Sequence, residues 1–190
     1  MRTKDENKRI AIYHAAMEII TADGLANTSM SKIAKAAGVS SSTLYVYFEN
    51  KEDMLNKLYL MAKEELSASM LQGGHEHREV KAGLELFLRN YINYSLSFPV
   101  KFSFQEQFYG SPNISPETKE KAQAYYAPLF EVLERGIQQG IIKDYPRELI
   151  GAFIFAPAIF IVRAHHNKEL EATEQLLEKA LEMTWQAIRA

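Results

Sequence analysis

The chain contains no cysteine, which excludes disulfide frameworks, thiol nucleophiles and cysteine-ligated zinc. Glycine and proline are scarce, with 9 and 6 in 190 residues, and the β-branched alternation typical of strands is missing. The longest apolar run, residues 149–162, is about 14 residues long against the roughly 20 that span a membrane, so a buried helix and no membrane contact are predicted. The net charge of −2 excludes a protein that is basic everywhere and restricts any nucleic-acid contact to a local surface.

The motifs of common enzyme chemistry are also missing. No G-x-S-x-G, glycine-rich phosphate loop or H-E-x-x-H sequence occurs, so neither an enzyme nor a cofactor is predicted. The pairs His75-x-His77 and His165-His166 have no carboxylate partner at helix-face spacing and lie at predicted helix ends, where solvated histidine is ordinary, so no metal site is predicted. No apolar stretch follows the charged N-terminus, which predicts no signal peptide and a cytoplasmic location.

Apolar residues recur at helical spacing between sparse stop signals, which predicts an all-α chain of about nine helices. Ser29 and Ser40 are each placed to cap a short helix, and Gly38 lies where a left-handed residue ends the first of the two. Pro128 and Pro157 lie inside predicted helices, where each would free a carbonyl and bend its helix. The predicted helices cover approximately residues 4–23, 30–37, 41–48, 51–71, 80–98, 100–109, 116–139, 146–165 and 168–189.

Two short helices joined by a glycine turn fit the helix-turn-helix pattern, in which the second helix enters the major groove of DNA and the first crosses its backbone. The spacing alone also fits any tight helical corner. Residues 41–48 favour DNA binding because the predicted helix is short and its hydroxyl and phenol side chains are too polar for a core. Such groups suit contacts with phosphates and base edges.

Three runs in this region are specific: I-A-K-A-A-G-V-S begins at Ile33, T-L-Y-V-Y-F at Thr43 and N-K-E-D-M-L at Asn50. Together they closely resemble the signature of tetracycline-repressor-type (TetR) transcriptional regulators. The resemblance implies a helix-turn-helix DNA-binding domain at residues 1–50 and a larger ligand-binding and dimerisation domain at residues 51–190, connected by a helix from 51 to about 71. It also implies a homodimeric repressor that a small molecule releases from a palindromic operator in double-stranded DNA.

The same resemblance implies roles for individual side chains. A serine on the first motif helix would approach DNA, the start of the second helix would read bases, and the phenols and one lysine would contact phosphates. The implied DNA-binding residues are Ser31, Ser41, Ser42, Thr43, Tyr45, Tyr47 and Lys51.

The second motif helix contains no arginine, lysine, asparagine or glutamine, so the bidentate pairings to guanine or adenine are unavailable there. Hydroxyl contacts, thymine-methyl contacts and DNA shape are the remaining routes to specificity. The N-terminal arm either adds groove or phosphate contacts or is a solvated charged terminus. Its basic residues are Arg2, Lys4, Lys8 and Arg9.

Most of the tyrosines and phenylalanines follow Leu84. A mostly apolar site with a few phenols fits a pocket for a bulky apolar or aromatic effector, and for each single residue a plain core position is the alternative. The predicted effector-binding residues are Tyr91, Tyr94, Phe108, Tyr125, Tyr126, Phe130 and Phe153.

The last predicted helix carries two adjoining apolar stripes, which is wider than one buried face needs. Together with the apolar run Leu149–Val162, the segment Leu170–Ile188 predicts a two-fold, four-helix dimer interface. A rival interpretation is a helical carrier or degenerate enzyme whose N-terminal fold is only structural, and the exposed hydroxyl-rich helix counts against it. One stripe consists of Leu170, Leu177, Leu181, Thr184 and Ile188, and the other of Leu176, Ala180, Met183 and Ala187.

Overall fold

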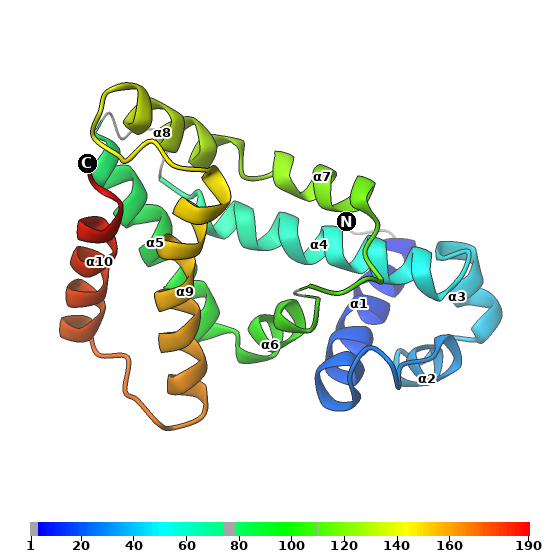
Figure 1. Cartoon of the computed structure of the whole chain (residues 1–190). Helices are drawn as coiled ribbons and strands as arrows, with labels where there is room; N and C mark the ends of the chain where they lie inside the picture. The colour runs from blue at the N-terminus through cyan, green and yellow to red at the C-terminus, as the bar shows by residue number, and fades with distance from the viewer. Residues whose placement is uncertain (1–3, 74–78, 109) are drawn as a thin grey trace. The chain divides into compact units, whose positions relative to one another are not determined.

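The computed structural model describes residues 4–73, 79–108 and 110–190 (Figure 1). In that part of the chain every named element is an α-helix, which confirms the predicted all-α class. The ten helices are α1 (Lys4–Asp23), α2 (Met30–Ala36), α3 (Ser41–Tyr47), α4 (Lys51–Met70), α5 (Val80–Ser97), α6 (Pro99–Gln107), α7 (Pro116–Ala124), α8 (Ala127–Gln138), α9 (Arg147–His166) and α10 (Glu174–Ile188).

The prediction of one helix over residues 116–139 was wrong, and this accounts for the tenth helix. α7 ends at Ala124, and Tyr126 has non-helical dihedral angles (φ −102°, ψ 14°) before α8 begins. Pro128 lies in the first turn of α8, where its missing N–H costs no hydrogen bond. In a continuous helix the same proline would clash with the carbonyl of Ala124 and leave it without a donor. The proline therefore starts a new helix instead of bending a long one.

The last helix also begins later than predicted. Thr173 caps α10 by accepting a hydrogen bond at 3.3 Å from the N–H of Leu176. Lys168, with φ of 62°, turns the chain after α9. Leu170 consequently lies in the connection between α9 and α10, and the helical part of the predicted dimer segment Leu170–Ile188 starts at Glu174.

The structure forms two compact units, and the first contains residues 1–64 and 99–122. Within it α1 packs against α2 and α6, and α2 packs against α3. The ring of Tyr13 on α1 meets Phe104 on α6 edge to face, with centroids 6.2 Å apart. The helix-turn-helix segment is therefore held on a core to which α6, distant in the sequence, also contributes. Fully buried members of this core include Ile12, Ile33, Leu44, Leu58 and Phe104.

The second unit contains residues 65–98 and 123–190. α5 packs against α8, α9 and α10, and α9 lies beside α10 (Figure 1). The segment after α8 is tied to the end of the chain, since the N–H of Lys143 donates to the oxygen of Ile188 and that of Ala190 donates to the oxygen of Ile141, both at 2.9 Å. These bonds fix α10 against the helices that precede it.

The predicted division by function, at residues 1–50 and 51–190, stays a prediction. The two compact units have other boundaries than these predicted domains, because α6 and the first part of α4 belong to the same unit as α1, α2 and α3. α4 itself continues without a break from residues of the first unit to residues of the second.

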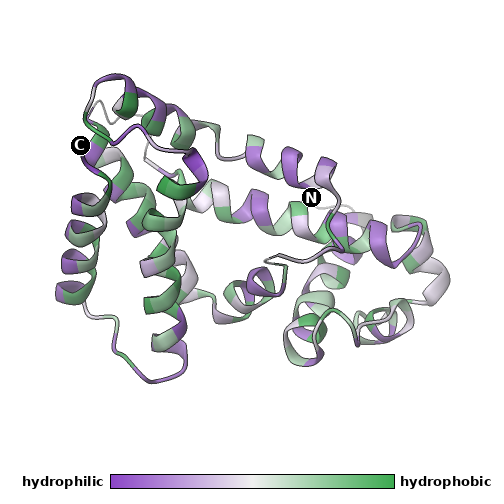
Figure 2. Cartoon of the chain, viewed as in Figure 1, coloured by the Kyte–Doolittle hydropathy of each residue, from purple (hydrophilic) through white to green (hydrophobic). Residues whose placement is uncertain are grey.

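α9 is the most apolar of the long helices, and its middle part is mostly green in Figure 2 while both ends carry purple. In the described part of the chain it is the one helix long and apolar enough to cross a membrane, with a mean hydropathy of 1.6 in its most apolar window. The run of about 14 apolar residues in the sequence is shorter than this helix because it leaves out the polar residues at both helix ends. Core helices of soluble proteins pass the same test, and only 33% of the window is buried within this single chain. A large part of the apolar surface of α9 is therefore uncovered.

Candidate functional site

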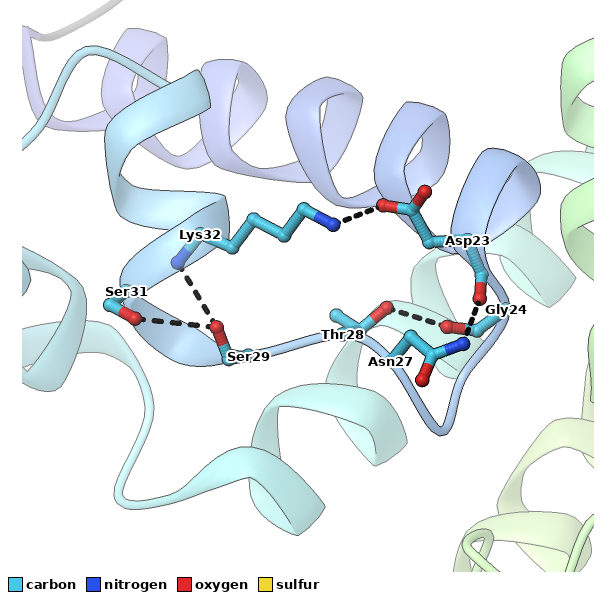
Figure 3. A network of polar contacts seen from close by, with 7 residues as sticks. All are labelled: Asp23, Gly24, Asn27, Thr28, Ser29, Ser31 and Lys32. Carbon is cyan, nitrogen blue, oxygen red and sulfur yellow. Dashed lines mark hydrogen bonds and ion pairs between the residues drawn. The ribbon is translucent and has the colours of Figure 1, made fainter.

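Polar contacts hold the turn between α1 and α2 (Figure 3). The hydroxyl of Thr28 donates to the oxygen of Gly24 at 2.9 Å, and Lys32 forms an ion pair with Asp23. Ser29 caps α2 by accepting from the N–H of Lys32, and its Oγ lies 3.3 Å from that of Ser31. Ser31 is exposed in the first turn of α2, a position open to a partner.

A second cap orders the start of α3. Gly38 adopts a positive φ of 65°, which lets the N–H of Val39 reach the oxygen of Ala34 and closes α2. Ser40 then caps α3 by accepting from the N–H of Thr43 at 3.0 Å. The Oγ of Ser40 also lies 2.8 Å from the hydroxyl oxygens of both Ser42 and Thr43. The hydroxyls at the start of α3 therefore bind one another.

The predicted DNA-binding residues of α3 differ in their exposure. Ser41, Ser42 and Tyr45 are exposed, whereas Thr43 and Tyr47 are half-buried beside the buried Leu44. Residues three and four apart share one helix face, so the outer surface of α3 consists of Ser41 with Tyr45 and of Ser42 with Val46. Val46 is absent from the predicted set because the T-L-Y-x-Y-F pattern leaves its position open. An apolar residue four positions after Ser42 on a polar helix is the signal that identifies it.

Lys51, the predicted phosphate-binding lysine, is half-buried at the start of α4. Its Nζ donates to the oxygen of Leu25 at 2.9 Å and to that of Ala26 at 3.4 Å. The lysine thus binds the segment after α1 to α4. An ammonium group has three protons, so a phosphate can still accept the remaining one.

The start of α4 is fixed by reciprocal hydrogen bonds. Asn50 accepts from the N–H of Asp53, while the Asp53 carboxylate accepts from the N–H of Glu49, both at 2.9 Å. Lys57 forms an ion pair with Asp53 at 2.8 Å and donates to the oxygen of Tyr47 at 3.1 Å. Burial alone would raise the pKa of Asp53, but the hydrogen bonds from Lys57 and Glu49 outweigh it and lower the pKa. The ion pair and the hydrogen bond of Lys57 therefore join the end of α3 to the start of α4.

The predicted effector-binding aromatics do not form one group. Phe108 lies in the first unit, where its ring meets Phe104 and Tyr59 edge to face at 4.9 and 5.6 Å. In the second unit Tyr91 is buried and meets Phe155 edge to face at 5.5 Å. Tyr125, Tyr126 and Phe130 are half-buried around the start of α8.

Two of these aromatics have charged neighbours. Burial, and after it the nearby Glu65 carboxylate, raises the pKa of the Tyr94 phenol. The guanidinium carbon of Arg147 lies 5.1 Å from the centre of the Phe130 ring. The second unit therefore offers polar groups beside aromatic surface, as a ligand with one polar end requires.

Phe153 differs from the other predicted effector-binding residues because it is 53% exposed. It lines an open groove of about 450 Å³ between α9 and the end of α10. The groove is bordered by Lys143, Tyr145, Leu149, Ile150, Phe153, Ala187 and Ile188.

The two stripes of α10 have different surroundings. Leu177, Leu181, Thr184 and Ile188 are buried within the chain itself. Met183, from the second stripe, is 73% exposed, and α9 exposes Leu149, Phe153 and Phe160. Apolar side chains left uncovered on two neighbouring helices are typical of an interface with another protein.

The histidines at the end of α9 bind the main chain. The Nδ1 atom of His165 accepts from the N–H of Ala172 at 3.3 Å, and the Nε2 atom of His166 lies 3.0 Å from the oxygen of Ser95. Among the residues that the structure describes, no three His, Cys, Asp or Glu side chains are grouped to hold a metal ion. His75 and His77 lie outside the described residues, as does Arg2 of the basic arm.

Two family models match the chain in turn. The model described as bacterial regulatory proteins, tetR family, matches residues 12–58. The model described as tetracyclin repressor-like, C-terminal domain, matches residues 85–189. The first match contains the helix-turn-helix segment, and the second extends over more than half of the chain.

Similar proteins agree with these matches. The crystal structure of a TetR family transcription regulator from Marinobacter aquaeolei VT8 is 31% identical, with a TM-score of 0.93, and the match covers 100% of this chain and 99% of that one. The fatty acid metabolism regulator protein of Bacillus subtilis is 29% identical over 142 residues, 72% of each protein. The crystal structure of the regulator FadR from Bacillus subtilis in complex with stearoyl-CoA is 25% identical, with a TM-score of 0.75, over 95% of this chain and 99% of that one.

A helical protein with a capped helix-turn-helix segment on its own core has the architecture of a DNA-binding regulator. The chain belongs to the tetR family of bacterial regulatory proteins. It is therefore a DNA-binding transcriptional regulator of a non-enzymatic family, whose members are soluble and typically cytoplasmic. Membership implies binding to operator DNA and to an effector ligand.

Proposed function

We propose that this protein is a homodimeric repressor, released from a palindromic operator when an apolar or aromatic molecule binds its C-terminal domain. The observation that carries the proposal is the outer face of α3, where Ser41, Ser42 and Tyr45 are exposed on a helix anchored by the buried Leu44. Exposed hydroxyls and a phenol on a helix of this kind suit contacts with bases and phosphates. Ser31, Thr43, Tyr47 and Lys51 complete the proposed DNA-binding surface.

The proposed dimer uses the exposed faces of α9 and α10. Leu149, Phe153 and Phe160 on α9 and Met183 on α10 are exposed in the single chain, and covering them removes apolar surface from water. Packing of the two helices against the same pair of a second copy gives a two-fold four-helix bundle. A two-fold dimer presents two identical copies of α3, which is why the proposed operator is an inverted repeat.

The proposed effector class is a long-chain acyl thioester. Support comes from the similar Bacillus subtilis FadR, whose structure contains stearoyl-CoA. The predicted effector-binding residues supply aromatic surface for an acyl chain. Within the proposal, Tyr91, Tyr125, Tyr126 and Phe130, all in the second unit, contribute to the site, and a role for Phe108 stays a prediction.

The proposed route of release is α4. This helix runs unbroken from Lys51 to Met70, from residues of the first unit to residues of the second. A ligand that fits only one position of α4 would change the spacing of the two α3 helices in the dimer. A coupling free energy of about 1–3 kcal/mol changes DNA affinity roughly 5- to 150-fold, and by linkage operator DNA weakens ligand binding by the same factor.

The test begins with an operator duplex selected from a random-sequence pool by the ligand-free protein. Fluorescence anisotropy then measures operator affinity with stearoyl-CoA, with coenzyme A alone and with no addition. We expect an inverted repeat as the selected sequence and weaker binding with stearoyl-CoA only. Equal operator affinity under all three conditions would contradict the proposed effector class, and a selected site without symmetry would contradict the proposed dimeric mode of binding.

A further inference from the structure

Val46 is the most exposed of the large hydrophobic side chains in the part of the chain that the structure describes, with 80% of its surface accessible. It lies on α3, next to the exposed Tyr45 and four residues after the exposed Ser42. The apolar contacts that fix α3 are made by Leu44 and, just after the helix, by Phe48, both of which are buried. Val46 therefore contributes little to the fold, and its outward position places an apolar group on the proposed DNA-binding surface.

The neighbouring groups on α3 have limited capacity to read bases by hydrogen bonding. The helix carries no side chain that can pair with guanine or adenine in a bidentate manner. The hydroxyls of Ser42 and Thr43 each lie 2.8 Å from Ser40 Oγ, so they already share a hydrogen-bonding partner within the protein. Apolar contact is therefore a further route by which this helix can distinguish bases.

Thymine presents the one apolar group on the major-groove edges of the four ordinary base pairs, its C5-methyl. Valine is branched at Cβ and stiff at χ1, so its methyl groups occupy a defined position on the outer face of the helix. We propose that Val46 is a specificity-determining residue that contacts a thymine C5-methyl, so each operator half-site contains a thymine facing it. The inference rests on operator binding by this family and is independent of which effector releases the protein.

Deoxyuridine isolates this contact because it lacks the methyl group and keeps the Watson–Crick pairing of thymine. The duplex selected by the ligand-free wild-type protein is remade with each symmetry-related pair of thymines replaced by deoxyuridine, one pair at a time. Each replacement removes one methyl from each of the two half-sites, and the loss of one buried methyl weakens the binding of a half-site about fourfold. We expect one pair of positions to show this loss in fluorescence anisotropy titrations.

The matching protein variant is Val46→Ala, which shortens an exposed side chain and leaves no cavity. It should bind the thymine operator more weakly than wild type and lose its preference for thymine over deoxyuridine at that one pair of positions. Val100→Ala is the control, since Val100 is also exposed, at 44%, and lies on α6 of the same unit. This variant should retain the full preference.

Two results would overturn the inference: a wild-type protein indifferent to deoxyuridine at every position, or a Val46→Ala variant with unchanged preference. Neither result bears on release by stearoyl-CoA, because no effector is present. Conversely, failure of stearoyl-CoA to weaken binding would contradict the proposed function and leave the deoxyuridine result intact. A wild-type protein that selects no duplex at all would overturn both.

Discussion

The Nζ atom of Lys51 donates a hydrogen bond to the main-chain oxygen of Leu25, 2.9 Å away. This contact joins the start of α4 to the segment after α1, so the proposed phosphate-binding lysine also stabilises the DNA-binding unit. The two roles have separate signatures. A phosphate contact affects the salt dependence of DNA binding, whereas the hydrogen bond affects the stability of the protein alone.

Lys51→Met retains most of the aliphatic stem and removes the charge and its hydrogen bonds. We expect a lower Tm and weaker binding to all duplexes, with the slope of log affinity against log salt reduced by about 0.9 for each phosphate that Lys51 neutralises in the wild-type complex. Thermal melting and salt titrations measure the two effects. A lower Tm with an unchanged slope would show that Lys51 is structural only.

Asp53→Asn tests the acid dependence of stability. The folded-state pKa of Asp53 is lowered, so its carboxylate contributes stability above the unfolded-state pKa and loses that contribution as pH falls through the folded-state value. Near neutral pH the variant should be less stable by about 1 kcal/mol, as for other helix-capping interactions. Below about pH 4, where aspartate begins to protonate, the difference should shrink. Urea denaturation at neutral and acidic pH measures it, and a difference independent of pH would contradict the assignment.

Gly136→Ala should destabilise the protein because the added Cβ would lie 2.6 Å from Ile142 Cδ1 and 2.8 Å from Val80 Cγ1. Overpacking of this kind costs about 1–3 kcal/mol, which exceeds the gain from alanine in a helix. Gly151→Ala is the matched control, because Gly151 is also helical and its Cβ would meet nothing within 4 Å. The control should be at least as stable as wild type in urea denaturation. Equal stability of the two variants would show that the side chains of Ile142 and Val80 can make room for the added Cβ.

Met183→Glu tests the proposed dimer face. Met183 is 73% exposed in the single chain, so a charge there leaves the fold intact and disfavours burial against a second copy. Sedimentation velocity should show a folded monomer with much weaker operator binding. Leu177→Glu serves as the contrast: Leu177 is only 4% exposed, so this change should unfold the chain itself. A Met183→Glu protein that stays dimeric would place the interface elsewhere.

The helix-turn-helix segment was predictable because its signals are local. Ser29 and Ser40 cap the helices that they precede, and Gly38 takes the positive φ expected of it. Each of these features depends on residues within a few positions in the sequence. The break at Pro128 was also encoded locally. Whether Pro128 begins a new helix or bends a longer one depends on where α7 ends.

Other features depend on segments far apart in the sequence. The sequence showed two apolar stripes on the last helix, but only packing against α5 and α9 decides that the stripe of Leu177 is buried and that of Met183 is not. The same holds for α6, which packs on α1 through Phe104 and Tyr13. No local pattern selects that partner.

The amino-acid sequence by itself determined the helical class, the family resemblance and the DNA-binding segment, because caps, turns and apolar periodicity act over neighbouring residues. Only the tertiary structure decided which groups remain available to partners. It ties the hydroxyls of Ser42 and Thr43 to Ser40 and engages Lys51 with Leu25, while Val46 stays exposed. Exposure and hydrogen-bond occupancy follow from contacts between elements, and a residue type alone does not specify them.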